Sequence, residues 1–121
     1  MKRRTKALQF DKKTREAIAR RDGMMCFFCR MGYEMPEKSN CLGMIFDTMH
    51  IVGKAQGGMG VMENGVLGCR YHHNLLDASL NRKEMMTMID DYMKELYPDW
   101  NRRDLVYSKQ DPSGAHISRK L

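Results

Sequence analysis

Two pairs of candidate metal ligands, far apart in the sequence, constrain this chain more strongly than any other feature. The stretch CFFC holds Cys26 and Cys29 at the Cys-x-x-Cys spacing, which lets both sulfurs reach one tetrahedral ion. Cys69 and His72 stand at positions i and i+3, so they share one face if a helix begins there. Together these residues predict a structural Zn²⁺ site of the Cys3His type.

Two alternatives to this ligand set stay open. Cys26 and Cys29 alone would also suit a redox-active pair, and Cys41 could replace His72 as the fourth ligand. We favour His72, because Cys41 lies in mid-loop without a partner at knuckle spacing, and we expect Cys41 to be a small buried hydrophobe. A chain of 121 residues with thirteen Met and four Phe has a limited core, so Zn²⁺ would supply folding free energy that the core lacks.

No apolar run approaches the roughly 18 residues needed to span a bilayer. The N-terminal sequence MKRRTKALQF also lacks the apolar segment of a signal peptide. We therefore expect a cytoplasmic protein that does not bind membranes, whose cysteines bind metal in preference to forming disulfides.

Positive charge is concentrated at the N-terminus. The formal net charge is +6, and residues 1–22 carry nine Lys and Arg against three acids, which leaves the rest of the chain neutral. A basic segment on a balanced domain suits attraction to a polyanion such as a nucleic acid, and a solubilising or disordered terminus is the alternative. The candidate DNA contacts are Lys12, Lys13, Arg20, Arg21, Lys54 and Arg70; an ordinary surface charge is the alternative for the last two.

We expect a single domain over residues 1–121. Residues 1–23 would form a flexible basic lead-in up to residue 10, and then a helix capped by Asp11 and ended by Gly23. Residues 24–80 would form a zinc-stapled core. In it a strand in LGMIFDTMHIV is followed by a glycine-rich loop, a short strand or turn in VLGC and a helix in RYHHNLLDASL.

Residues 81–109 would add an amphipathic helix and a packing segment, and residues 110–121 a loose tail. The helix over 82–97 is predicted by apolar residues at i, i+3, i+4 and i+7 spacing, namely Met85, Met88, Ile89, Tyr92 and Leu96. After Pro98 we expect the chain to pack back through Trp100, Leu105 and Tyr107.

The stretch DTMHIVGKAQGGMGVMENGVLGCRYHH resembles the motif of the HNH endonuclease family, in particular the small nucleases that bacteriophages and prophages encode. The resemblance rests on an opening His, a Gly-Gly loop, an Asn, and a Cys-x-x-His pair followed directly by a last His. These are His50, Gly57, Gly58, Asn64, Cys69, His72 and His73, with Cys26 and Cys29 as the upstream zinc pair.

The resemblance implies an α+β fold with a small ββα-metal core, also called a His-Me finger, flanked by an N-terminal basic helix and a C-terminal amphipathic helix. It implies that His50 is the general base and that His73 holds a catalytic Mg²⁺ or Mn²⁺, with Ni²⁺ or Zn²⁺ as alternatives. Asn64 would fix the His50 tautomer, hold the loop or ligate the ion. Asp77, four residues after His73, is a candidate second ligand.

One departure from the family pattern concerns the residue before the general base, where many members carry a metal-ligating Asp or His. Here that residue is Met49, a poor ligand for a hard cation. Asp47 could take its place only if a bulge turned it inward, because strand alternation separates Asp47 from His50.

The sequence therefore predicts a metal-dependent DNA endonuclease of low sequence specificity. The resemblance implies that it acts in phage packaging, recombination or junction processing, with phage proteins of those processes as partners. A non-catalytic, zinc-stapled nucleic-acid-binding protein is the alternative, and Met49 favours it. A structural or assembly protein is a third interpretation.

Overall fold

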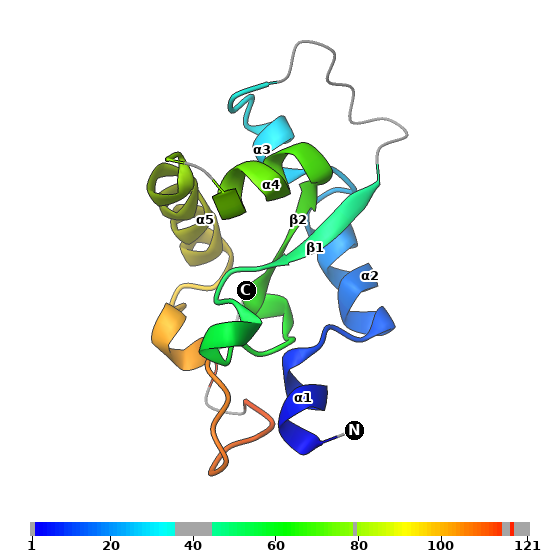
Figure 1. The fold of residues 1–121 in the computed structure, drawn as a ribbon, viewed down its shortest axis with the longest axis vertical. Coiled ribbons are helices and arrows are strands. Elements are labelled where there is room, and N and C mark those ends of the chain that lie inside the picture. The colour runs from blue at the N-terminus through cyan, green and yellow to red at the C-terminus, as the bar shows by residue number, and fades with distance from the viewer. Residues whose placement is uncertain (1, 36–44, 79, 115–116, 118–121) are drawn as a thin grey trace.

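The structure is a computed structural model that describes residues 2–35, 45–78, 80–114 and 117 (Figure 1). The prediction for Cys41 lies outside the described residues. The helices and strands are, in chain order, α1 (Arg3–Leu8), α2 (Lys12–Arg21), α3 (Phe27–Arg30), β1 (Phe46–His50), β2 (Gly65–Cys69), α4 (Arg70–Ala78) and α5 (Arg82–Leu96). Short 3₁₀ turns cover Lys54–Gln56, Met62–Asn64 and Arg102–Leu105.

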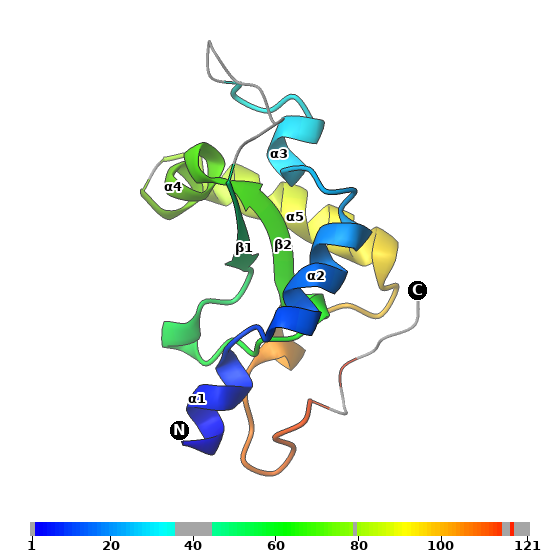
Figure 2. The same cartoon turned by 90° about the vertical axis from the view of Figure 1, so that its right-hand side faces the viewer.

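A two-stranded antiparallel sheet lies at the centre of the fold. Strands β1 and β2 pair in regular register, from Phe46 opposite Cys69 to His50 opposite Gly65. Helix α4 begins at the residue directly after β2. Helix α2 lies on one side of the sheet, and α4 and α5 lie on the other (Figure 2). This arrangement agrees with the α+β class that was predicted, and the predicted strand and helix segments are confirmed.

Helix α2 forms where the sequence predicted it. The Asp11 carboxylate accepts a hydrogen bond from the Thr14 N–H at 2.7 Å, as an N-cap does. Ile18 is fully buried, and Gly23 takes a positive φ of 73° just past the helix end.

The N-terminal ten residues are not the flexible lead-in that the sequence suggested. They form α1 and then a short extended stretch; Leu8, the last residue of α1, and Phe10 are buried. The N–H of Gly60 donates to the Ala7 carbonyl at 2.9 Å, which ties this segment to the loop before β2. The prediction was wrong because it weighed the basic residues and overlooked the apolar pair Leu8 and Phe10 between them.

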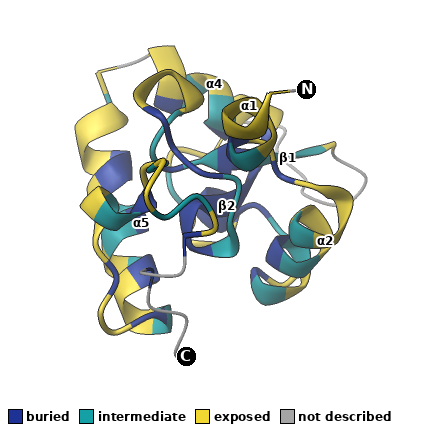
Figure 3. Ribbon diagram, turned by 90° about the horizontal axis from the view of Figure 1, so that it is seen from below, coloured by how far each residue is buried: buried dark blue, intermediate teal, exposed yellow. Residues whose placement is uncertain are grey.

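Helix α5 buries one face against the rest of the molecule and leaves the opposite face exposed (Figure 3). Met85, Ile89 and Met93 are fully buried, whereas the predicted Met88, Tyr92 and Leu96 are half-buried at the edge of that face.

The chain after α5 packs back as predicted. The Trp100 indole N–H donates to the Glu63 carbonyl at 2.7 Å, and Leu105 is fully buried. Ile117 also joins the core, so the predicted loose tail is wrong at that residue. Within the described parts of the chain, no helix has both the length and the apolar character needed to cross a bilayer.

Candidate metal centre and active-site pocket

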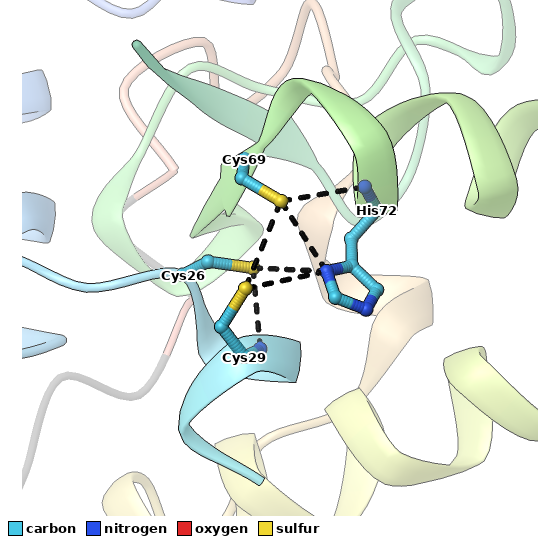
Figure 4. A group of neighbouring side chains, drawn as sticks. All are labelled: Cys26, Cys29, Cys69 and His72. Carbon is cyan, nitrogen blue, oxygen red and sulfur yellow. Dashed lines mark hydrogen bonds between the residues drawn. The ribbon is translucent and has the colours of Figure 1, made fainter. Parts of the chain in front are cut away.

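Three cysteines and one histidine point toward one another from separate parts of the chain (Figure 4). Cys26 caps the N-terminus of α3 and Cys29 lies within that helix, while Cys69 ends β2 and His72 lies in the first turn of α4. All four side chains are buried, and their ligand atoms lie within 4.8 Å of one another. The two sequence motifs therefore form one cluster.

The separations within this cluster fit a tetrahedral metal ion. The Sγ atoms of Cys29 and Cys69 are 3.8 Å apart, and His72 Nδ1 lies 3.3 to 3.6 Å from the three sulfurs. Zinc bonds of the usual length at tetrahedral angles place two sulfurs about 3.8 Å apart and a sulfur and a nitrogen about 3.6 Å apart. Cys26, Cys29, Cys69 and His72 could therefore hold one metal ion such as Zn²⁺.

The surroundings of His72 fix the orientation of its ring. His72 Nε2 lies 2.6 Å from the Tyr33 carbonyl oxygen, which can only accept, so Nε2 carries the proton and Nδ1 presents its lone pair to the sulfurs. The Phe28 ring stacks on the imidazole at 5.5 Å. Burial raises the pKa of the Cys26 thiol, which therefore favours the neutral form unless a cation compensates the thiolate charge.

A pocket of about 540 Å³ lies along the free edge of β1. The N-terminal segment, β1, the turn after it and α4 each contribute side chains. Its lining residues are Gln9, Phe10, Arg15, Asp47, Thr48, His50, Lys54, Arg70, His73 and Asn74. The predicted general base His50 and the predicted metal ligand His73 therefore face the same pocket, whereas the neighbouring His72 belongs to the buried cluster.

His50 is held by the N-terminal segment. Its Nε2 lies 2.8 Å from the Leu8 carbonyl oxygen, so Nε2 carries the proton, and the Phe10 ring lies against the imidazole at 4.2 Å. No described residue makes a hydrogen bond to Nδ1. Burial lowers the pKa of His50 below its ordinary value, and the charge of Lys54 acts in the same direction, while the bond to Leu8 partly opposes them. His50 is therefore a neutral imidazole at pH 7 with a lone pair on Nδ1.

Asn64 holds the loop between the strands. Its side chain is fully buried, its Oδ1 accepts from the Val52 N–H at 2.7 Å, and its Nδ2 donates to the carbonyls of Val52 and Met59 at 3.0 and 2.8 Å. Gly58 completes this arrangement, because a Cβ there would lie 1.7 Å from the Val52 carbonyl oxygen. Of the three roles considered for Asn64, the geometry fits the loop-holding one. The His50 tautomer is fixed by Leu8 instead.

His73 lies between two carboxylates. Its Nδ1 is 2.8 Å from Asp47 Oδ2, and its Nε2 is 3.4 Å from Asp77 Oδ2. Arg70 donates to both oxygens of Asp47, at 2.9 and 3.1 Å. Burial works in the opposite direction, but the hydrogen bonds from His73 and Arg70 hold the pKa of Asp47 below its ordinary value. Asp47 is therefore an ionised acceptor for the His73 ring.

Asp47 reaches the pocket without the bulge that we had expected to be necessary. The register of β1 is regular, and Met49 packs on the core side with 1% exposure, close to Gly68. Strand alternation does place Asp47 and His50 on opposite faces, but β1 is one of only two strands in the described sheet. Its outer edge is open, so residues from both of its faces can border one pocket.

Of the predicted DNA contacts, Arg21 is the one that the structure removes. Its side chain is 7% exposed, pairs with the buried Asp22 at 2.9 Å and donates to the carbonyls of Met62 and Gly65. Arg21 therefore joins α2 to β2 and is not available to a ligand.

The other predicted basic residues are accessible. Lys12, Lys13, Arg20, Lys54 and Arg70 are exposed, and the last two border the pocket.

Two features of the pocket escaped the sequence analysis. Arg15 borders the pocket, with one guanidinium nitrogen donating to the Phe10 carbonyl at 2.8 Å, and helical spacing from the buried Ile18 could have placed it beside the sheet. The Leu8 carbonyl that binds His50 has no sequence signal, because a main-chain group carries no residue identity.

Comparison with models of protein families, with curated proteins and with solved structures finds no match for this chain. The two sites must therefore be interpreted from their own chemistry. One is a buried Cys3His cluster, and the other is an open pocket lined by two imidazoles, one carboxylate and three cationic side chains.

Proposed function

We propose that this chain is a metal-dependent endonuclease of the HNH type, with a ββα-metal core that hydrolyses phosphodiester bonds in DNA. The observation that carries the proposal is the pairing of His50 and His73 across one pocket. His50 presents an unprotonated Nδ1, and His73 presents Nε2 beside the Asp77 carboxylate. A proton acceptor and a metal-ligand pair are the two components that such hydrolysis requires.

His50 is the general base of the proposed reaction. Its Nδ1 takes a proton from a water molecule, while the water oxygen forms a bond to phosphorus and the bond from phosphorus to the leaving sugar oxygen breaks. The leaving oxygen then takes up a proton from solvent. The lowered pKa of His50 favours this role, because the imidazole is unprotonated at neutral pH and its Nδ1 lone pair is free to accept a proton.

His73 and Asp77 are the residues that would hold the catalytic ion. Their ligand atoms are 3.4 Å apart, and two bonds of about 2.1 Å at roughly tetrahedral angles span that separation. A bound divalent ion would stabilise the negative charge that develops on the phosphate and the leaving oxygen. Asp47 accepts from His73 Nδ1 and so directs Nε2 toward Asp77, which makes Asp47 an orienting group.

The charge of the pocket supports a phosphate substrate. Arg15, Lys54 and Arg70 border it, and α2 carries further exposed basic residues. Arginine and lysine contacts of this kind bind the nucleic-acid backbone and carry little base information, so we propose low sequence specificity. Packaging, recombination or junction processing in a phage remains the proposed context, on the resemblance alone.

A plasmid-nicking assay with Mg²⁺, Mn²⁺ and Ni²⁺ tests the proposal. We expect the wild-type chain to convert supercoiled plasmid to the open-circular form. His50→Ala should lose about 10²- to 10⁴-fold in rate, and added imidazole should restore part of that loss by replacing the missing base. Equal nicking by the wild type and His50→Ala, with no response to imidazole, would overturn the proposal.

A non-catalytic DNA-binding protein is the second candidate. Two observations favour it. Met49 stands at the position where many members of the HNH family carry a metal ligand, and its side chain is buried in the core. The Asp47 carboxylate is already paired with Arg70 and His73. In that case the chain would bind DNA with a steep salt dependence. The plasmid would stay supercoiled with the wild type and with His50→Ala, whichever metal is added.

A further inference from the structure

The N-terminal segment forms one wall of the catalytic pocket. Gln9 and Phe10 border the pocket beside Arg15 of α2, and the Leu8 carbonyl accepts the hydrogen bond from His50 Nε2. The Phe10 ring also covers the imidazole. Among the described residues, the hydrogen bond to a His50 ring nitrogen and the aromatic ring that packs on the imidazole therefore both come from this segment, residues 7–10, which includes the end of α1.

One close approach attaches this segment to the core. Gly60 donates its N–H to the Ala7 carbonyl, and a Cβ at Gly60 would lie 2.0 Å from the Gln9 carbonyl oxygen and 2.2 Å from its carbon. Those neighbours are backbone atoms and cannot rotate away. Only glycine at this position lets the segment lie close enough for Leu8 to reach His50.

We propose that residues 7–10 are a positioning element of the active site, in which the Leu8 main-chain carbonyl fixes the His50 ring with Nδ1 toward the pocket. Arg3, Arg4 and Lys6 on α1 directly precede this element, so a contact between α1 and the DNA backbone would act on the segment that orients the base. The catalytic meaning of this inference rests on the proposed function. The orientation of His50 can be measured without it.

The first test is Gly60→Ala in the full chain loaded with Zn²⁺, with Gly53→Ala as the matched control. Gly53 lies in the same loop, and a Cβ there would meet only the flexible end of the Gln56 side chain. NMR of the ring ¹⁵N and ¹H nuclei reports the His50 Nε2 proton and the His50 pKa. In the wild type and in Gly53→Ala we expect a protected Nε2 proton and a lowered pKa.

In Gly60→Ala the Nε2 proton should exchange rapidly, because the acceptor has moved away. The His50 pKa should rise toward its ordinary value, because the ring is less buried. Nicking should fall by roughly 10- to 100-fold, as a misplaced catalytic group does. The acid limb of the pH–rate profile should move to higher pH as the His50 pKa rises. A general loss of stability would lower the rate without this shift.

Leu8→Ala is the second variant, in case Gly60→Ala does not fold. It adds no atom and removes the buried side chain that anchors the segment, so it should shift the same signals in the same direction. A protected Nε2 proton and an unchanged His50 pKa, in a variant whose residues 3–9 have lost their native chemical shifts, would overturn the inference. A wild-type chain that shows the protected proton but does not nick DNA would overturn only the proposed function.

Discussion

The two sites of this molecule are built in opposite ways. The Cys3His cluster is closed, because four buried residues from two short motifs supply all four ligands. The pocket is open, and its two imidazoles depend on groups that do not carry the family resemblance, namely the Leu8 carbonyl for His50 and the Asp47 carboxylate for His73. The cluster is suited to hold the fold together, whereas the pocket leaves ring nitrogens available for chemistry.

This difference shows that the direction in which a histidine side chain points, and not its identity alone, decides which site it belongs to. His72 and His73 are sequence neighbours, yet helical geometry turns them about 100° apart. His72 is fully buried and faces three sulfurs, while the His73 side chain is 32% exposed and faces two carboxylates. The difference between the two sites can therefore be tested by substituting His72 and His73 one at a time.

The largest expected effect separates these two neighbours. His72→Ala should abolish binding of one Zn²⁺ per chain and remove of the order of 10 kcal/mol of metal-linked folding free energy, so that the chain unfolds. His73→Ala should keep both the zinc and the fold, and lose nicking. Metal analysis, circular dichroism and the nicking assay measure the three quantities. If both variants retained zinc, or both lost it, the division between the sites would be wrong.

The next effect concerns a second pair of neighbours, Arg20 and Arg21. Arg21→Ala should destabilise the fold by about 3–5 kcal/mol in denaturant unfolding, because it leaves the fully buried Asp22 carboxylate without its cationic partner. Arg20→Ala removes an exposed charge, so its stability should change by no more than about 0.5 kcal/mol while DNA binding weakens. Equal destabilisation by the two substitutions would contradict the structural role assigned to Arg21.

These pairs show which parts of the molecule the sequence could predict. The metal cluster was predictable because its ligands occur at fixed local spacings, and α2 and α5 because their apolar periodicity spans several turns. The roles of Arg20 and Arg21 were not separable, because both count equally as positive charges. Only the buried Asp22, with no sequence signal of its own, decides between them.

The pocket was predicted only in part, because the groups that orient its histidines also lack a sequence signal. His50 and His73 were recognised from a resemblance, but the groups that orient them come from the segment before α2 and from the outer edge of β1. Strand alternation, a rule that holds within a sheet, excluded Asp47 from the pocket unless β1 carried a bulge. It did not anticipate that the described two-stranded sheet leaves β1 with an open edge, where residues from both of its faces can border one pocket.

A smaller effect should follow from Asp47→Asn, which keeps the shape of the side chain and removes its charge. The His73 ring would lose its ionised acceptor, so nicking should fall by about 10- to 100-fold while zinc content stays unchanged. Asp91→Asn, the same change on the exposed face of α5, is the control and should behave as the wild type. A full loss of zinc in Asp47→Asn would mean that the two sites are not independent.

The smallest effect is expected at Lys54, and it tests the electrostatics of the open site. The Lys54 charge helps to keep the His50 pKa low, so Lys54→Met should raise that pKa. The active form is the unprotonated base, whose fraction grows as the pH rises. The acid limb of the nicking profile should therefore move to higher pH, with no change in the midpoint for the control Lys83→Met. Lys54 is exposed, so the shift should shrink in high salt; a shift independent of salt would point to a packing change near His50.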